Sequence, residues 1–104
     1  MARAQLELWL DRGWLGSFGM PIYFIHVRQG RRLAKDTEGK CFPDLQAAER
    51  EAIRAAREMA AQRVRAGKTL RLSSRLEIVD SKGKVAAVVT FKDAIPISDA
   101  DELA

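Results

Sequence analysis

Residues 43–67 read PDLQAAEREAIRAAREMAAQRVRAG, and this stretch decides the fold of the chain. Its apolar residues recur with the 3.6-residue period of an α-helix, and alanines dominate them, so the helix can lie close against a sheet. Asp44 is a strong N-cap candidate, because its carboxylate can accept hydrogen bonds from the free N–H groups of the first turn. Its negative charge also interacts favourably with the positive end of the helix dipole. Gly67 supplies the stop. We predict one long helix over residues 44–66.

The segments on both sides of this helix predict strands. Ahead of it, residues 22–28 are apolar on both sides, which is typical of a central strand, and Gly30 supplies a turn into a more polar edge strand over residues 32–37. After it, residues 75–80 alternate between apolar and charged, and residues 85–91 are again apolar on both faces, so we expect them to be central too. The predicted fold class is α+β: ββαββ, a four-stranded antiparallel sheet with one long helix packed on one face.

Length and composition indicate one domain. A chain of 104 residues has room for a single core. Residues 1–19 contain three glycines that interrupt a short apolar segment, and we expect a weakly structured N-terminal extension ahead of a domain over residues 20–92. Residues 93–104 read as an acidic mobile tail. A single cysteine, no membrane-spanning apolar run and no signal peptide favour a cytoplasmic protein without disulfides.

A helix can cover only one face of such a sheet, and the apolar side chains of residues 85–91 cannot all lie beneath it. An uncovered apolar sheet face usually marks an interface. We therefore predict homodimerisation through the sheet, or coverage of that face by residues 1–19. The candidate interface residues are Tyr23, Ile25, Val27 and Val88.

Charge is spread unevenly along the chain. The net charge is +4, but residues 20–92 hold 16 Lys and Arg against 8 Asp and Glu. The candidate contacts to an anion or a nucleic acid are Arg28, Arg31, Arg32, Arg50, Arg54 and Arg57. Further cations follow the helix: Arg63, Arg65, Lys68 and Arg71. Because glutamates interleave with the helical arginines and no nucleic-acid-binding motif is present, a solvated surface is favoured over nucleic-acid binding.

The residues suited to catalysis or metal binding form no recognisable constellation. His26 is the only histidine, and its pairing with Cys41 would lack a third member, so a structural role for His26 is favoured. Four acids, Asp36, Glu38, Asp44 and Asp80, fit no calcium-loop spacing and are typical of turns. Neither a dinucleotide-binding glycine motif nor a P-loop occurs. We predict no catalytic residues, no metal site and no cofactor.

Several spaced motifs resemble those of a known family. They are Met20-Pro-x-Tyr23-Phe24-x-His26-Val27-Arg28-x-Gly30, Asp36-x-Glu38-Gly39, Pro43-Asp44-Leu45-x-Ala47-Ala48-x-x-Glu51-Ala52 and Glu77-Ile78-x-Asp80-x-x-Gly83. This pattern resembles the small bacterial proteins known as domain of unknown function 6894, over residues 20–92. The resemblance implies a compact domain with no established activity or site residues. A fold-level analogy links the order of elements to HicB-type antitoxin domains, which are similar in placing an alanine-rich helix after a strand pair.

Together these features predict a small non-enzymatic protein-interaction module of unknown partner that self-associates. The alternative is a basic nucleic-acid-associated or antitoxin-like regulatory protein, and an enzyme ranks third. No membrane partner is expected.

Overall fold

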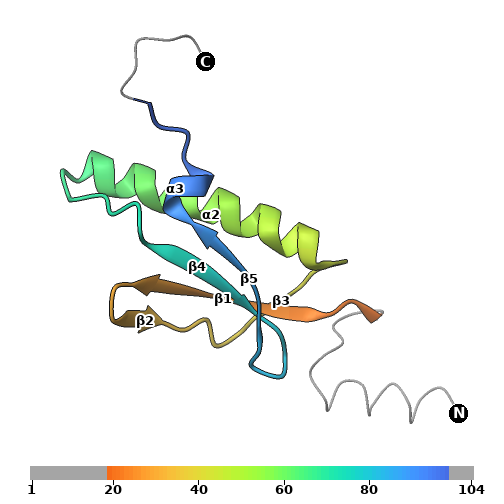
Figure 1. Ribbon diagram of the computed structural model, residues 1–104. Coiled ribbons are helices and arrows are strands. Elements are labelled where there is room, and N and C mark those ends of the chain that lie inside the picture. Colours follow the sequence, from red (N-terminus) through yellow and green to blue (C-terminus); the bar gives the residue numbers. More distant parts are fainter. Residues whose placement is uncertain (1–18, 99–104) are drawn as a thin grey trace, which may run out of the picture.

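Helix α2 (Leu45–Arg65) lies across one face of an antiparallel sheet in the computed structural model, which describes residues 19–98 (Figure 1). In chain order the strands are β1 (Ile22–Gln29), β2 (Arg32–Ala34), β3 (Lys40–Cys41), β4 (Arg75–Val79) and β5 (Val85–Thr90). A short helix, α3 (Phe91–Ala94), follows β5. The predicted α+β class and the long helix over the sheet are confirmed, with β3 and α3 as additions that the sequence pattern did not indicate.

The sheet runs in the order β2-β1-β4-β5, and β3 pairs with β1 beyond the end of β2. The central position of β1 and the edge position of β2 are as predicted. The central position expected for residues 85–91 is wrong, because β5 is the other edge strand. Its apolar character on both faces does not come from burial on both faces, since Val85 and Val88 are each 48% exposed.

Both ends of α2 follow local signals in the sequence. Asp44 is the N-cap, and its Oδ1 accepts from the N–H of Ala47 over 2.8 Å. At the other end Gly67 takes a φ of +70°, and the N–H groups of Gly67 and Lys68 donate to the carbonyls of Val64 and Arg63. This bonding pattern is a Schellman motif, and it satisfies carbonyls that the helix end leaves free.

The contact between helix and sheet is built from small side chains on α2 and larger ones beneath it. The buried helical residues, spaced four apart, are Ala48, Ala52, Ala56 and Ala60. Leu76 and Ile78 from β4 and Phe91 from α3 are the largest fully buried side chains. Because the alanines add little thickness, the backbone of the helix can approach the sheet closely, as the alanine-rich stripe predicts.

Strand β2 is shorter than predicted because a side chain takes over its pairing. The strand ends at Ala34 rather than near residue 37. Beyond it, Oδ2 of Asp36 accepts from the backbone N–H of Ile25 over 3.1 Å, so a carboxylate fills the gap between β2 and β3 along the edge of β1. This bond satisfies a strand N–H that lacks a strand partner there.

Strand β5 ends one residue earlier than predicted because Thr90 begins a helix. Its Oγ1 accepts from the N–H of Asp93 over 3.1 Å, which makes Thr90 the N-cap of α3. Ala94, assigned to the tail from the sequence, is 1% exposed in α3. Residues 1–18 of the predicted extension and residues 99–104 of the predicted tail lie outside the described residues, and so does the predicted coverage of the sheet by the extension.

Candidate functional site

The face of the sheet opposite α2 carries a polar cluster beside an apolar edge. Strand register places His26, Glu77 and Val88 in one row across β1, β4 and β5, and Arg28, Arg75 and Thr90 in the next. Successive strand residues point to opposite faces. The six residues named above therefore lie on the face that α2 leaves uncovered. The residues that alternate with them on β1 and β4 point toward α2.

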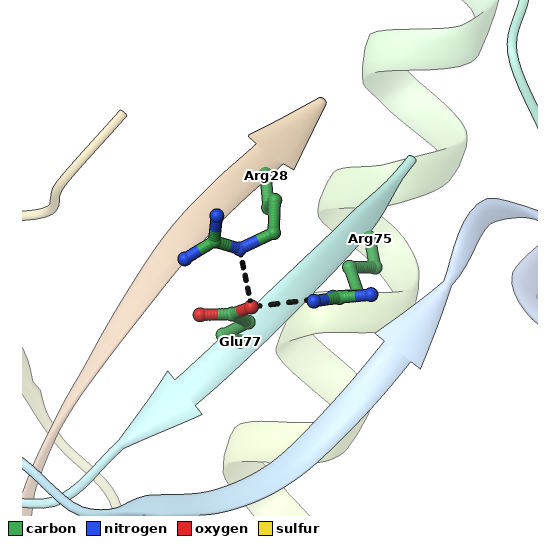
Figure 2. Close-up of polar contacts among 3 residues, drawn as sticks. All are labelled: Arg28, Arg75 and Glu77. Carbon is green, nitrogen blue, oxygen red and sulfur yellow. Dashed lines mark hydrogen bonds and ion pairs between the residues drawn. The ribbon is translucent and has the colours of Figure 1, made fainter. Parts of the chain in front are cut away.

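Glu77 is the centre of the polar cluster. The residue is 8% exposed, and its Oε2 accepts from Nε of Arg28 over 2.8 Å and from Nε of Arg75 over 3.2 Å. Figure 2 shows the three side chains converging on the side of the sheet away from the helix. The hydrogen bond from Arg28, with a smaller contribution from Arg75, lowers the pKa of Glu77 although burial opposes the shift. The cluster therefore holds a nearly buried carboxylate in its charged form.

His26 and Asp36 form a second polar unit beside this cluster. The backbone N–H of Asp36 donates to Nδ1 of His26 over 3.0 Å, so neutral His26 carries its proton on Nε2. The carboxylate of Asp36 accepts from the N–H groups of Ile25, Glu38 and Gly39. Burial alone would raise the pKa of Asp36, but these three hydrogen bonds lower it. Both side chains thus organise the loop between β2 and β3, which fits the structural role predicted for His26.

The structure does not bring His26 and Cys41 together as a catalytic pair. Cys41 lies in β3 opposite Ile22, and His26 is four residues further along β1. At the rise of a β-strand this offset is about 13 Å. A Cys–His pair needs hydrogen-bond contact between its side chains, so this arrangement does not provide one.

The acids singled out in the sequence serve turns and caps. Asp36 and Asp44 bind backbone N–H groups as described above, and Oδ1 of Asp80 accepts from the N–H groups of Lys82 and Lys84, each over 2.9 Å. The Glu38 side chain is exposed. Within residues 19–98, no group of three or more His, Cys, Asp or Glu side chains is placed to hold a metal ion.

The candidate interface residues lie on two different faces. Tyr23, Ile25 and Val27 pack against the hydrophobic core on the α2 side, whereas Val88 is exposed on the opposite face. Alternation along β1 was visible in the sequence, but which side α2 covers was not. The feature that sequence reasoning missed is the outer edge of β5. The absence of any charged residue from residues 85–90 was the available signal.

The candidate arginines also lie in separate places. Arg28 lies on the uncovered face within the Glu77 cluster, and Arg31 and Arg32 follow it in the β1–β2 hairpin. The remaining three are exposed on α2, where Arg54 forms ion pairs with Glu51 and Glu58 and Nε of Arg57 donates to the carbonyl of Ala94 over 2.7 Å. The six therefore do not form one continuous track.

Within residues 19–98, these observations define a small α+β domain with one long helix over an antiparallel sheet, a polar cluster on the face that this helix leaves uncovered and an apolar edge without a strand partner. The profile of the family described as Domain of unknown function (DUF6894) matches residues 22–92, and the chain belongs to this family. Neither a curated protein nor a solved structure matches the chain. The analogy with HicB-type antitoxin domains stays a prediction. The described helices include none with the length and apolar character needed to cross a bilayer.

Proposed function

We propose that this protein is a small non-enzymatic interaction module that acts as a homodimer, joined through the outer edges of two β5 strands. The observation that carries the proposal is the composition of this edge. Strand β5 reads VAAVVT and is the last strand of its sheet, so one row of its backbone N–H and C=O groups has no strand partner within residues 19–98. Soluble proteins usually protect such an edge with charged residues or proline, and β5 has neither.

The exposed side chains of β5 support the same conclusion. Val85 and Val88 are each 48% exposed, and Ala86 between them is exposed as well. Paired strands would bury part of this apolar surface while satisfying the backbone groups. The turn at Lys84 and the start of α3 at Phe91 bound the accessible stretch at its two ends. A partner strand thus has a short, defined place to bind.

A second copy of β5 fits this edge in an antiparallel orientation. Such pairing is two-fold symmetric, so the same surface serves both copies. In this orientation the free row of N–H and C=O groups on one β5 faces the same row on the other copy, so the two strands can exchange hydrogen bonds.

The test is the mass of the full chain across a concentration series, measured by light scattering. We expect a species of twice the 11.6 kDa chain mass. Val88→Lys places a charge on the edge strand and is expected to shift the equilibrium to monomer. The matched control is Val64→Lys, because Val64 is 63% exposed on α2, away from the sheet edge. A monomeric wild type, or equal effects of the two variants with unchanged circular dichroism, would overturn the proposal.

A further inference from the structure

One end of the domain gathers cations from segments that are far apart in the sequence. The β1–β2 hairpin, the last turn of α2 and the α2–β4 connection meet there (Figure 1, left). A concave site of about 330 Å³ confirms their proximity, since it is lined by Gln29 of β1 together with Gln62, Arg63 and Lys68. We define the basic end by six side chains: Arg31, Arg32, Arg63, Arg65, Lys68 and Arg71.

These six cations carry nearly all of the net charge of the described domain. Residues 19–98 hold 16 Lys and Arg and nine Asp and Glu, a net charge of +7; without the six, ten bases face nine acids. Neither residues 27–35 nor residues 59–76 contain an acid. The ion pairs between described residues involve Arg28, Arg54 and Arg75, so the basic end has no carboxylate partner in this part of the chain.

Only some of the six cations stabilise the structure around them. Arg63 and Arg65 lie in the last turn of α2, where cations favour the negative end of the helix dipole, and Nε of Arg63 donates to the carbonyl of Thr69 over 2.6 Å. Arg31, Arg32, Lys68 and Arg71 are all exposed and form no hydrogen bond through their side chains within residues 19–98. Their self-repulsion costs stability unless an anion binds.

We propose that the basic end binds the phosphate backbone of a nucleic acid without reading its sequence. Most of the six are arginines, whose planar guanidinium groups match phosphate oxygens with paired hydrogen bonds. The cations are spread over three segments, which suits a line of phosphates better than a single small anion. The amides of Gln29 and Gln62 in the concave site add donors and acceptors for a sugar or a base edge. Arg31 and Arg32 lie in the hairpin at the β2 edge, which is the opposite edge of the sheet from β5, so dimerisation through β5 would leave this part of the surface accessible.

The test measures binding of the full chain to a mixed-sequence DNA duplex and to a single-stranded oligonucleotide, from about 50 to about 200 mM salt. The test variant carries Arg31→Gln, Arg32→Gln, Lys68→Gln and Arg71→Gln. The control variant removes the same charge from exposed sites elsewhere: Lys40→Gln, Arg50→Gln, Lys82→Gln and Lys84→Gln.

We expect the test variant to raise Kd for the duplex by at least about tenfold and to flatten its salt dependence by about 3.6 in log–log slope, since each of the four lost phosphate contacts contributes about 0.9. The Kd of the control variant is expected to stay within about threefold of the wild-type value, because its four substituted residues make no direct phosphate contacts. Equal losses in both variants would show that only net charge matters and would overturn the proposal. Absence of binding to either oligonucleotide would overturn it too, as would binding to anionic lipid vesicles in preference to both.

Discussion

Nε of Arg28 donates to Oε2 of Glu77 over 2.8 Å and joins β1 to β4 on the face of the sheet that α2 leaves uncovered. Arg75, two residues before Glu77 on β4, donates to the same oxygen. A carboxylate that is almost buried would be unfavourable alone, so these two bonds are what keep it in the sheet.

Replacing this carboxylate should destabilise the fold. Glu77→Gln keeps the shape of the side chain but removes its charge, and we expect the free energy of unfolding to fall by about 1–3 kcal/mol. Urea denaturation measures the change. Glu58→Gln is the control, because Glu58 forms an ion pair with Arg54 on the exposed side of α2. Such exposed pairs contribute less than about 1 kcal/mol, so similar losses in the two variants would contradict the role of the cluster.

Stability should depend on pH through Glu77 and Asp36. The pKa of each carboxyl is lower in the folded chain than its ordinary value. The unfolded chain therefore takes up protons first as the pH falls, and stability is fully present above the unfolded pKa values of about 4. It is lost as the pH drops through the lower folded pKa values. We expect the urea concentration at the unfolding midpoint to stay constant from about pH 7 and to decrease as the pH falls from about 4 to about 3.

The double variant Glu77→Gln, Asp36→Asn serves as the control for this pH dependence. It lacks both shifted carboxyls, so its midpoint should change less across the same range than that of the wild type. If the urea midpoints of the two proteins decreased equally as the pH falls, other groups would be responsible for the loss of stability.

Asp36 should contribute more to the stability of the fold than is usual for a loop residue. Asp36→Ala leaves three backbone N–H groups without their acceptor, those of Ile25, Glu38 and Gly39. We expect a loss of about 2 kcal/mol or more and faster hydrogen exchange at the Ile25 amide. Asp93→Ala is the control, because Asp93 is exposed and the capping bond in α3 uses its backbone rather than its carboxylate. An unchanged exchange rate at Ile25 would count against the role given to Asp36.

Gly39 should tolerate substitution less well than Gly30, although both have positive φ. A Cβ at Gly39 would lie 2.7 Å from Cε2 of Phe24 and 2.9 Å from Cγ2 of Ile22, whereas one at Gly30 would meet nothing within 4 Å. Gly30→Ala is expected to cost about 1 kcal/mol from backbone strain alone. Gly39→Ala should cost about 1 kcal/mol more, because aromatic and β-branched side chains must move. Thermal denaturation compares the two, and equal costs would contradict the predicted steric contact.

The helix was predictable because its determinants are local. Asp44, the alanine stripe and Gly67 act within a few residues of the positions that they specify, and α2 begins and ends within one residue of the predicted limits. The same holds for β1, whose bounds follow from an apolar run and a glycine turn, and for β4, whose bounds follow from alternation and a turn. The pairing of β1 with β4 was not predictable in this way, since the whole of α2 separates these two strands in the sequence.

In the candidate site, too, the individual residues were predictable from the sequence but the contacts between them were not. The sequence identified Arg28, His26 and Asp36 as residues of interest, but no pattern indicated that Arg28 would share Glu77 with Arg75 or that Asp36 would accept from the edge of β1. Those contacts join residues between 2 and 49 positions apart, and they depend on strand register. The edge of β5 likewise became visible only once the sheet order was known.

Local chemistry alone was sufficient to specify one capped helix, the α+β class and an excess of basic residues, since capping, periodicity and charge are properties of short segments. Packing decided the rest: α2 covers Tyr23, Ile25 and Val27, β5 lies at an edge, and cations from three segments meet at one end. The reason is physical. Strand order and facing are set by burying the largest apolar surface against the alanines of α2, and that depends on the whole chain at once.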